Sequence, residues 1–290
     1  MRSFLRQDYL GIGLMITMLV SPLAIISMRV SSSEIFLDDS SPNPTSSEFN
    51  FHLRTRNQIF KGLDEWEEAY AEKKYRAQSC AIIICDMWDK HWCKNANERG
   101  AKLAVKINNI VTKARQKGTI IIHAPSECMS FYEKSPARER MKRIKKIPMP
   151  KPIDLPDPIC PVDASDGGCD DEKPTKPYKA WTRQTATIKI DENNDFVSDQ
   201  GSEIYSLLRE NKIELVLIMG VHTNMCILHR SFAIKPLTKA GIRCALVRDL
   251  TDAMYNPSMP PRISHQEGTD RIIQFIEKYW CPSILSKEIQ

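Results

Sequence analysis

The chain has 290 residues, of which 42% are hydrophobic and 27% charged, so its composition is that of a globular protein with a sizeable core. This length allows one large domain or two small ones. The net charge of +5 is mild, and no basic motif interleaved with aromatic residues is present. Composition therefore gives no reason to expect a nucleic-acid partner.

The N-terminus carries a long uncharged run. Arg2 and Arg6 precede residues 9–28, which contain no charged side chain. Such a run is typical of a transmembrane signal anchor or of a cleaved signal peptide. Its length favours the anchor, so we expect residues 1–30 to hold the chain at a membrane as a single-pass protein through residues 9–28. Secretion after cleavage is the alternative.

Two polar segments follow the apolar run. Residues 31–50 are rich in Ser, Pro and Asp, which indicates a flexible linker. Residues 51–79 are polar and contain the helix-like sequence 66–70, so we expect a helical N-terminal extension packed on the domain that follows. That domain is predicted to span residues 80–290.

Apolar runs and amphipathic segments alternate from residue 80 onward. Residues 81–85 and 119–122 read as buried strands, and the periodic segment 97–117 between them reads as a helix that Gly118 ends. Strand, helix and strand in this order form a right-handed parallel unit. We therefore predict an α/β fold, a Rossmann-like three-layer α/β/α sandwich around a mostly parallel sheet of roughly six strands.

The middle of the domain carries a long insertion at about residues 134–178. It begins with a basic run, Lys134–Lys151, and continues with a segment rich in Pro and Asp. Long loops without regular structure are usually lids or binding loops. Cys160 and Cys169 lie in this insertion and are expected to pair if the compartment is oxidising.

A possible nucleophile follows the buried strand at residues 213–218. The sequence turns at Gly220 and enters a helical segment, so Cys226 is predicted to lie in the first turn of a helix. Free N–H groups and the helix dipole there favour a thiolate. A cysteine in such a place is a candidate nucleophile. An inert buried thiol is the alternative.

Asp86 is the candidate partner of Cys226. It follows the strand at residues 81–85, and parallel α/β sheets bind ligands beyond the carboxyl ends of their strands. A carboxylate beside a thiol can take its proton, and a nearby cation can hold the resulting anion. The alternative is that Asp86 caps a turn.

An apolar strand that ends in Asp86, followed by Gly220-Val-His-Thr-Asn-Met-Cys226 at the start of a helix, resembles the isochorismatase-like cysteine hydrolases. These include nicotinamidases and related amidases. The resemblance runs from about residue 80 to residue 284. It implies an Asp–Lys–Cys triad, a small-molecule substrate and a non-proline cis peptide bond, which falls at Val221–His222.

The resemblance predicts a reaction. Asp86 acts as general acid and base, and Cys226 forms a thioester while an amide-type carbon–nitrogen bond is cleaved. Backbone N–H groups near His222 and Cys226 are expected to hold the oxyanion. The alternative function is a catalytically inactive, membrane-tethered binding module on the same fold, and a homo-oligomer is left open.

The triad cation has two main candidates. The family's Lys stands shortly before an Ala-Phe or similar pair, and Asp195-Phe196 takes that place here, which favours Lys189. Arg183 is the alternative, because Arg stays charged but does not shuttle protons.

No cofactor is expected, although zinc stays an alternative. Asp89 and His91 have ligand-like spacing and His123 follows a strand, but the family's Asp-x-His pattern is missing. We therefore predict that His123 lines the substrate pocket, together with Trp88, Trp181 and Arg183.

Overall fold

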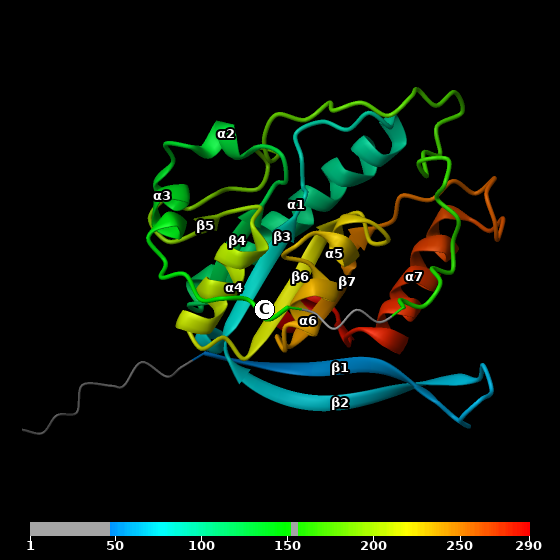
Figure 1. Ribbon diagram of the computed structural model, residues 1–290, viewed down its shortest axis with the longest axis horizontal. Coiled ribbons are helices and arrows are strands. Elements are labelled where there is room, and N and C mark those ends of the chain that lie inside the picture. Colours follow the sequence, from blue (N-terminus) through cyan, green and yellow to red (C-terminus); the bar gives the residue numbers. More distant parts are fainter. Residues whose placement is uncertain (1–46, 152–155) are drawn as a thin grey trace, which may run out of the picture. The chain divides into compact units, whose positions relative to one another are not determined.

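The structure is a computed structural model that describes residues 47–151 and 156–290 (Figure 1). The predicted signal segment 1–30 and most of the predicted linker 31–50 lie outside the described residues. The hydrolase-like domain predicted from residue 80 onward is described except for residues 152–155 of its insertion.

One eight-stranded sheet organises the described chain, in the order β2-β1-β8-β7-β6-β3-β4-β5 (Figure 1). The strands from β8 to β5 are all parallel, and β1 and β2 add an antiparallel hairpin beside β8. The predicted α/β fold with a mostly parallel sheet is therefore confirmed, and the hairpin accounts for the two strands beyond the expected six. The strands are β1 (Glu48–Gln58), β2 (Trp66–Arg76), β3 (Cys80–Cys85), β4 (Ile120–Ala124), β5 (Phe196–Val197), β6 (Leu215–Val221), β7 (Cys244–Asp252) and β8 (Ser283–Ile284).

Helices cover both faces of the sheet, which gives the predicted three layers. Side chains of β3 alternate between two apolar cores: Ile83 faces one and Ile82 the other. The first core is closed by α4, α6 and α7, and the second by α1. The helices are α1 (Lys94–Gln116), α2 (Met129–Tyr132), α3 (Pro136–Lys142), α4 (Gly201–Glu210), α5 (Cys226–His229), α6 (Ile234–Lys239) and α7 (His265–Tyr279), with short 3-10 turns η1 (Ala77–Ser79) and η2 (Ser286–Ile289).

The extension predicted to be helical is instead the β1–β2 hairpin. Phe49, Phe51 and Leu53 are buried and alternate with exposed polar residues, a period of two that belongs to a strand. Their burial on the second core holds the hairpin against the sheet. The sequence of β2 did not show the alternation of a strand, because Tyr75 is its one buried residue and most of the others are polar.

The predicted transmembrane segment, signal anchor and single-pass membrane location need correction. Within residues 47–151 and 156–290, no helix combines the length and the apolar character needed to cross a membrane. Residues 9–28, on which those predictions were based, lie outside the described residues.

Gly220 brings β6 close to β3. Its φ is +117°, and a Cβ atom there would overlap the carbonyl oxygen of Cys85. We expect Gly220→Ala to destabilise the protein by about 1–3 kcal/mol, because the backbone must move and the conformation is strained. Thermal unfolding measures this.

Gly100→Ala is the matched control for that measurement. Gly100 lies in α1 with open space around its Cα, so the substitution should stabilise the protein by roughly 0.5–1 kcal/mol. If both variants unfold at the same temperature, the close approach at Gly220 is not needed.

Candidate active site

Two neighbouring strands bring the predicted pair together. β3 and β6 are parallel, and Cys85 lies opposite Gly220. Asp86, which follows β3, therefore emerges beside the turn that leads from β6 to Cys226. The Asp86 carboxylate and the Cys226 thiol lie close enough that each shifts the pKa of the other.

Asp86 is fully buried, and its carboxylate accepts two hydrogen bonds. The Ser126 N–H donates to its Oδ1 at 2.7 Å, and Arg230 Nε donates to its Oδ2 at 3.0 Å. Burial raises the pKa of Asp86, while Arg230, Cys226 and Ser126 oppose that rise. On balance the pKa of Asp86 is raised, which makes its carboxylate a stronger base.

Cys226 does not lie in a thiolate-favouring site, contrary to the prediction. Burial raises the pKa of its thiol well above the usual value, and the negative charge of Asp86 raises it further. Arg230 and the His222 backbone N–H act in the opposite direction. Because α5 has only four residues, it offers little helix dipole. The resting thiol is protonated and must pass its proton to Asp86 before it can attack.

Arg230 is the cation beside Asp86, and sequence reasoning missed it. The predicted candidates lie elsewhere: Lys189 is exposed, with its backbone N–H bonded to Asn108. The Arg183 guanidinium lies over the Phe131 ring. Neither Lys189 nor Arg183 contacts Asp86. Arg230 stands four residues after Cys226, one helical turn further, and this spacing was the available signal.

The peptide bond Val221–His222 is cis, as the resemblance implied. It leads into the turn that carries Cys226. The backbone of His222 lowers the pKa of the Cys226 thiol, and the N–H of Cys226 has no acceptor in the described part of the chain. Burial lowers the pKa of His222 to about 3. Its ring is therefore neutral and does not supply the positive charge of the site.

A cavity of about 380 Å³ opens beside Cys226. The rings of Trp88 and Trp181 stack at 4.1 Å and form one wall. Both residues were predicted to line a substrate pocket, and both line this cavity. Residues of the insertion form part of the opposite rim. The lining residues are Trp88, His91, Trp92, Glu127, Gly167, Pro177, Tyr178, Lys179, Trp181, His222, Met225, Cys226, Arg230 and Met254.

His123 and Arg183 do not line this cavity, contrary to the prediction. His123 is buried, with one ring nitrogen bonded to Gln184 and the other to Asp195. Burial by itself would raise the pKa of Asp195, but the hydrogen bonds from His123 and Arg115 outweigh it and hold that pKa below its usual value. His123 therefore stabilises the negative charge of Asp195.

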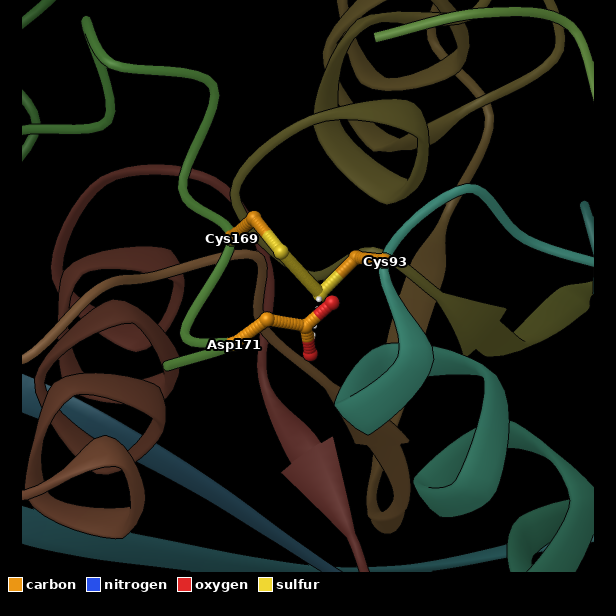
Figure 2. Close-up of side chains that lie close together, drawn as sticks. All are labelled: Cys93, Cys169 and Asp171. Carbon is orange, nitrogen blue, oxygen red and sulfur yellow. Dashed lines mark hydrogen bonds between the residues drawn. A yellow bond between two sulfur atoms is a disulfide. The ribbon is translucent and has the colours of Figure 1, made fainter. Parts of the chain in front are cut away.

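The suggested metal ligands are turned to separate partners. Asp89 accepts from Thr182, whereas His123 contacts Gln184 and Asp195. Within the described residues, the potential ligand atoms of Cys93, Cys169 and Asp171 do lie within 4.8 Å of one another (Figure 2). Both thiols of that group are already joined in a disulfide.

The Cys93–Cys169 disulfide replaces the predicted Cys160–Cys169 pair, and Cys160 is free and exposed. It joins the insertion to the start of α1. Asp171 accepts hydrogen bonds there from the N–H groups of Lys94 and Asn95, so its carboxylate satisfies the first donors of the helix.

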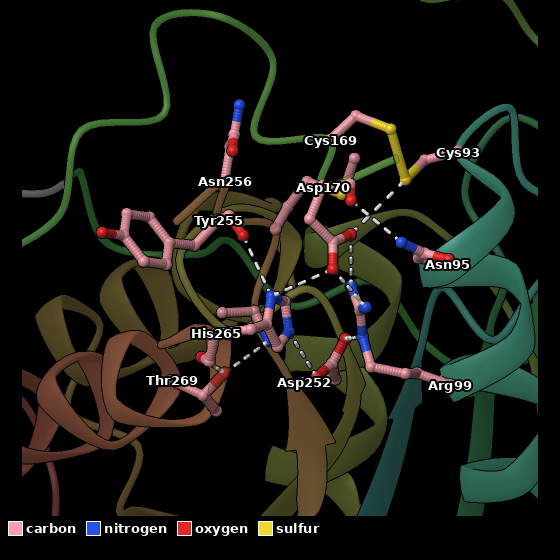
Figure 3. Close-up of polar contacts among 12 residues, drawn as sticks. Cys93, Asn95, Arg99, Cys169, Asp170, Asp252, Tyr255, Asn256, His265 and Thr269 are labelled. Carbon is pink, nitrogen blue, oxygen red and sulfur yellow. Dashed lines mark hydrogen bonds and ion pairs between the residues drawn. A yellow bond between two sulfur atoms is a disulfide. The ribbon is translucent and has the colours of Figure 1, made fainter. Parts of the chain in front are cut away.

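Ion pairs continue this attachment (Figure 3). Arg99 in α1 binds both carboxylate oxygens of Asp170, and its Nε donates to Asp252 at the end of β7. His265 contacts the other oxygen of Asp252. Asp170 also lies 3.7 Å from His265 at the start of α7, so the insertion is fastened to α1 and to α7.

Removing the disulfide should lower stability substantially. The bond closes a loop across 76 positions, and disulfides of this kind contribute about 2–4 kcal/mol. We expect the double variant Cys93→Ser/Cys169→Ser to unfold roughly 5–15 °C lower than the parent. Scanning calorimetry measures this, with Cys160→Ser as the control that should leave the midpoint unchanged. Equal midpoints for all three proteins would contradict the proposed role of the disulfide.

No family model and no curated protein matches the sequence. Among solved structures, the chain is similar to a cysteine hydrolase from Pseudomonas syringae pv. phaseolicola 1448A, with 13% identity, 74% of this chain and 92% of that chain covered, and a TM-score of 0.46. It is similar to an isochorismatase family protein from Desulfovibrio vulgaris subsp. vulgaris str. Hildenborough, with 17% identity, coverage of 72% and 95%, and a TM-score of 0.43. It is also similar to a nicotinamidase from Staphylococcus aureus, with 14% identity, coverage of 70% and 95%, and a TM-score of 0.35. These names are of the kind that the motif at Asp86 and residues 220–226 resembles.

Proposed function

We propose that this chain is an isochorismatase-like cysteine hydrolase that cleaves an amide-type carbon–nitrogen bond of a small molecule. One observation carries the proposal. The Cys226 thiol lies beside a buried carboxylate, Asp86, whose charge raises the pKa of the thiol and which is itself held by Arg230. Cys226 and Arg230 line an open cavity of about 380 Å³. A nucleophile, its base and an orienting cation are the parts that covalent catalysis requires.

The first half of the reaction forms a thioester. Asp86 takes the proton of the Cys226 thiol, and the sulfur attacks the carbonyl carbon of the substrate. The N–H groups of His222 and Cys226 are the donors we assign to the oxygen that becomes negative. The carbon–nitrogen bond then breaks, and Asp86 returns its proton to the departing amine.

The second half releases the acid. Asp86, again a carboxylate, takes a proton from water while the water oxygen attacks the thioester carbon. The carbon–sulfur bond breaks, and the proton passes to the sulfur, which restores the thiol. Arg230 does not exchange protons, since an arginine stays charged. Its contribution is to keep Asp86 ionised in a buried place.

A panel of small amides, incubated with the full chain, tests this proposal. We expect at least one to be hydrolysed, and Cys226→Ala to abolish the hydrolysis while leaving the fold intact. Cys160→Ala, at an exposed free thiol, is the matched control and should keep full activity. Hydrolysis that survives in Cys226→Ala would refute the proposal.

A catalytically inactive binding module is the second candidate. The observation that favours it is the raised pKa of Cys226, which leaves the thiol protonated at rest. This candidate predicts that compounds of the panel bind in the cavity and protect the protein against thermal unfolding, yet none is hydrolysed.

A further inference from the structure

The outer edge of the sheet is a long strand without a neighbour. β2 has 11 residues, and β1 pairs with one of its edges along the whole length. Within the described residues, nothing pairs with the other edge. An edge strand presents a row of N–H and C=O groups that another strand can bind.

The charges of β2 are separated along its length. Glu67 and Glu68 lie in its first half, whereas Lys73, Lys74 and Arg76 lie in its second half. Two copies of such a strand, placed antiparallel, bring the acidic half of each beside the basic half of the other. Opposite charges across antiparallel strands are stabilising, and like charges are destabilising.

We propose that this edge binds a second copy of the chain by antiparallel pairing of β2 with β2. The two-fold axis of such a dimer stands perpendicular to the continuous sheet. Side chains on one face of one copy therefore lie opposite side chains on the same face of the other. Only every second residue of the partner strand can therefore lie opposite a given residue, so each allowed register is centred on one residue of β2.

One of these registers fits the charges. When it is centred on Ala71, all of β2 is paired and Glu68 lies opposite Lys74 of the other copy. Trp66 then lies opposite Arg76, which allows a cation–π contact. A register centred on Tyr70 places Glu68 opposite Glu72, and one centred on Glu72 places that residue opposite itself. The Ala71 register is the one of these three without an opposed like-charge pair.

The side chains that this register uses are available. Lys74 is exposed and has no ion-pair partner in the described part of the chain. Glu68 binds Arg54 and Arg56 but keeps 38% of its side chain exposed. Forming the dimer therefore adds contacts without breaking the ion pairs inside the hairpin.

The turn of the hairpin supplies apolar surface. Ile59, Phe60 and Leu63 are exposed there by 46%, 63% and 49%. Antiparallel pairing places the turn of each copy beside the base of the other copy's β2, the end at which Lys73 and Tyr75 line a cavity of about 410 Å³. Strand pairing alone is small beside a standard interface of about 1,600 Å², so we expect the turns to contribute.

Sedimentation of the full chain, with its variants, tests the proposal. We expect a dimer at micromolar concentration, and Lys74→Glu to weaken it about tenfold, since two attractive pairs become repulsive. Hydrolytic activity should not change in Lys74→Glu, so a failure of this proposal is distinct from a failure of the proposed function. A monomer at all concentrations, or a dimer insensitive to Lys74→Glu, overturns the proposal.

Cross-linking tests the register itself. In this register Ala71 of one copy lies opposite Ala71 of the other, with the two Cα atoms about 4.5–5.5 Å apart. A disulfide spans this distance. Ala71→Cys should therefore form a covalent dimer on mild oxidation. Ala69→Cys is the matched control, because its two copies lie about 14 Å apart along the strands and should not cross-link. Cross-linking of Ala69→Cys in preference to Ala71→Cys overturns this register.

Discussion

Replacing Asp86 with Asn is expected to lower kcat by about 10²–10⁴-fold, the usual contribution of a positioned general base. Asn has nearly the same shape, but its single oxygen can accept only one of the two hydrogen bonds from Ser126 and Arg230, and it cannot take the thiol proton. Steady-state kinetics on an amide hydrolysed by the parent protein measures the effect.

The same substitution should accelerate alkylation of Cys226. The negative charge of Asp86 raises the pKa of that thiol, so its removal lowers the pKa and increases the thiolate fraction near neutral pH. Labelling with iodoacetamide and peptide mapping measures this rate, with buried Cys85 as the control for loss of structure. Slower labelling of Cys226 together with unchanged kcat would contradict the role given to Asp86.

Replacing Arg230 with Met should change the pH dependence of catalysis. The Arg230 charge opposes the rise that burial causes in the pKa of Asp86, so without it that pKa rises further. The base is active as a carboxylate, so the acid limb of the kcat/KM profile moves to higher pH. Activity falls about tenfold for each pH unit below the new pKa.

Arg230→Lys is the control for that experiment. Lys keeps the positive charge, although it lacks the planar guanidinium, so the acid limb should return toward its original position. If Arg230→Met and Arg230→Lys have the same profile as the parent, then Arg230 does not hold Asp86 ionised.

The pairing of Asp86 with Cys226 was predictable because it follows from a simple rule. Asp86 directly follows one apolar run that is buried on both faces, and Cys226 lies in the turn past another, and the ends of neighbouring parallel strands meet at one edge. The layers were predictable for the same reason, since apolar runs alternated with amphipathic segments. None of these inferences needs a contact between distant side chains.

Other features depend on such contacts, and the sequence does not contain them. Lys189 was favoured because a cation was sought upstream of Cys226, whereas Arg230 lies on its C-terminal side. Cys169 has several possible partners, and spacing along the chain does not favour Cys93 over Cys160. The raised pKa of Cys226 depends on how deeply the thiol is buried, which no local pattern reports.

The most direct test of the account is the mass of the protein during turnover. A reaction with a hydrolysed amide is quenched in acid, and the intact chain and its peptides are weighed. The account predicts an added acyl group on the peptide that contains Cys226, and no such group in Cys226→Ala. Rapid turnover in which Cys226 stays unmodified, and which survives in Cys226→Ala, would contradict it.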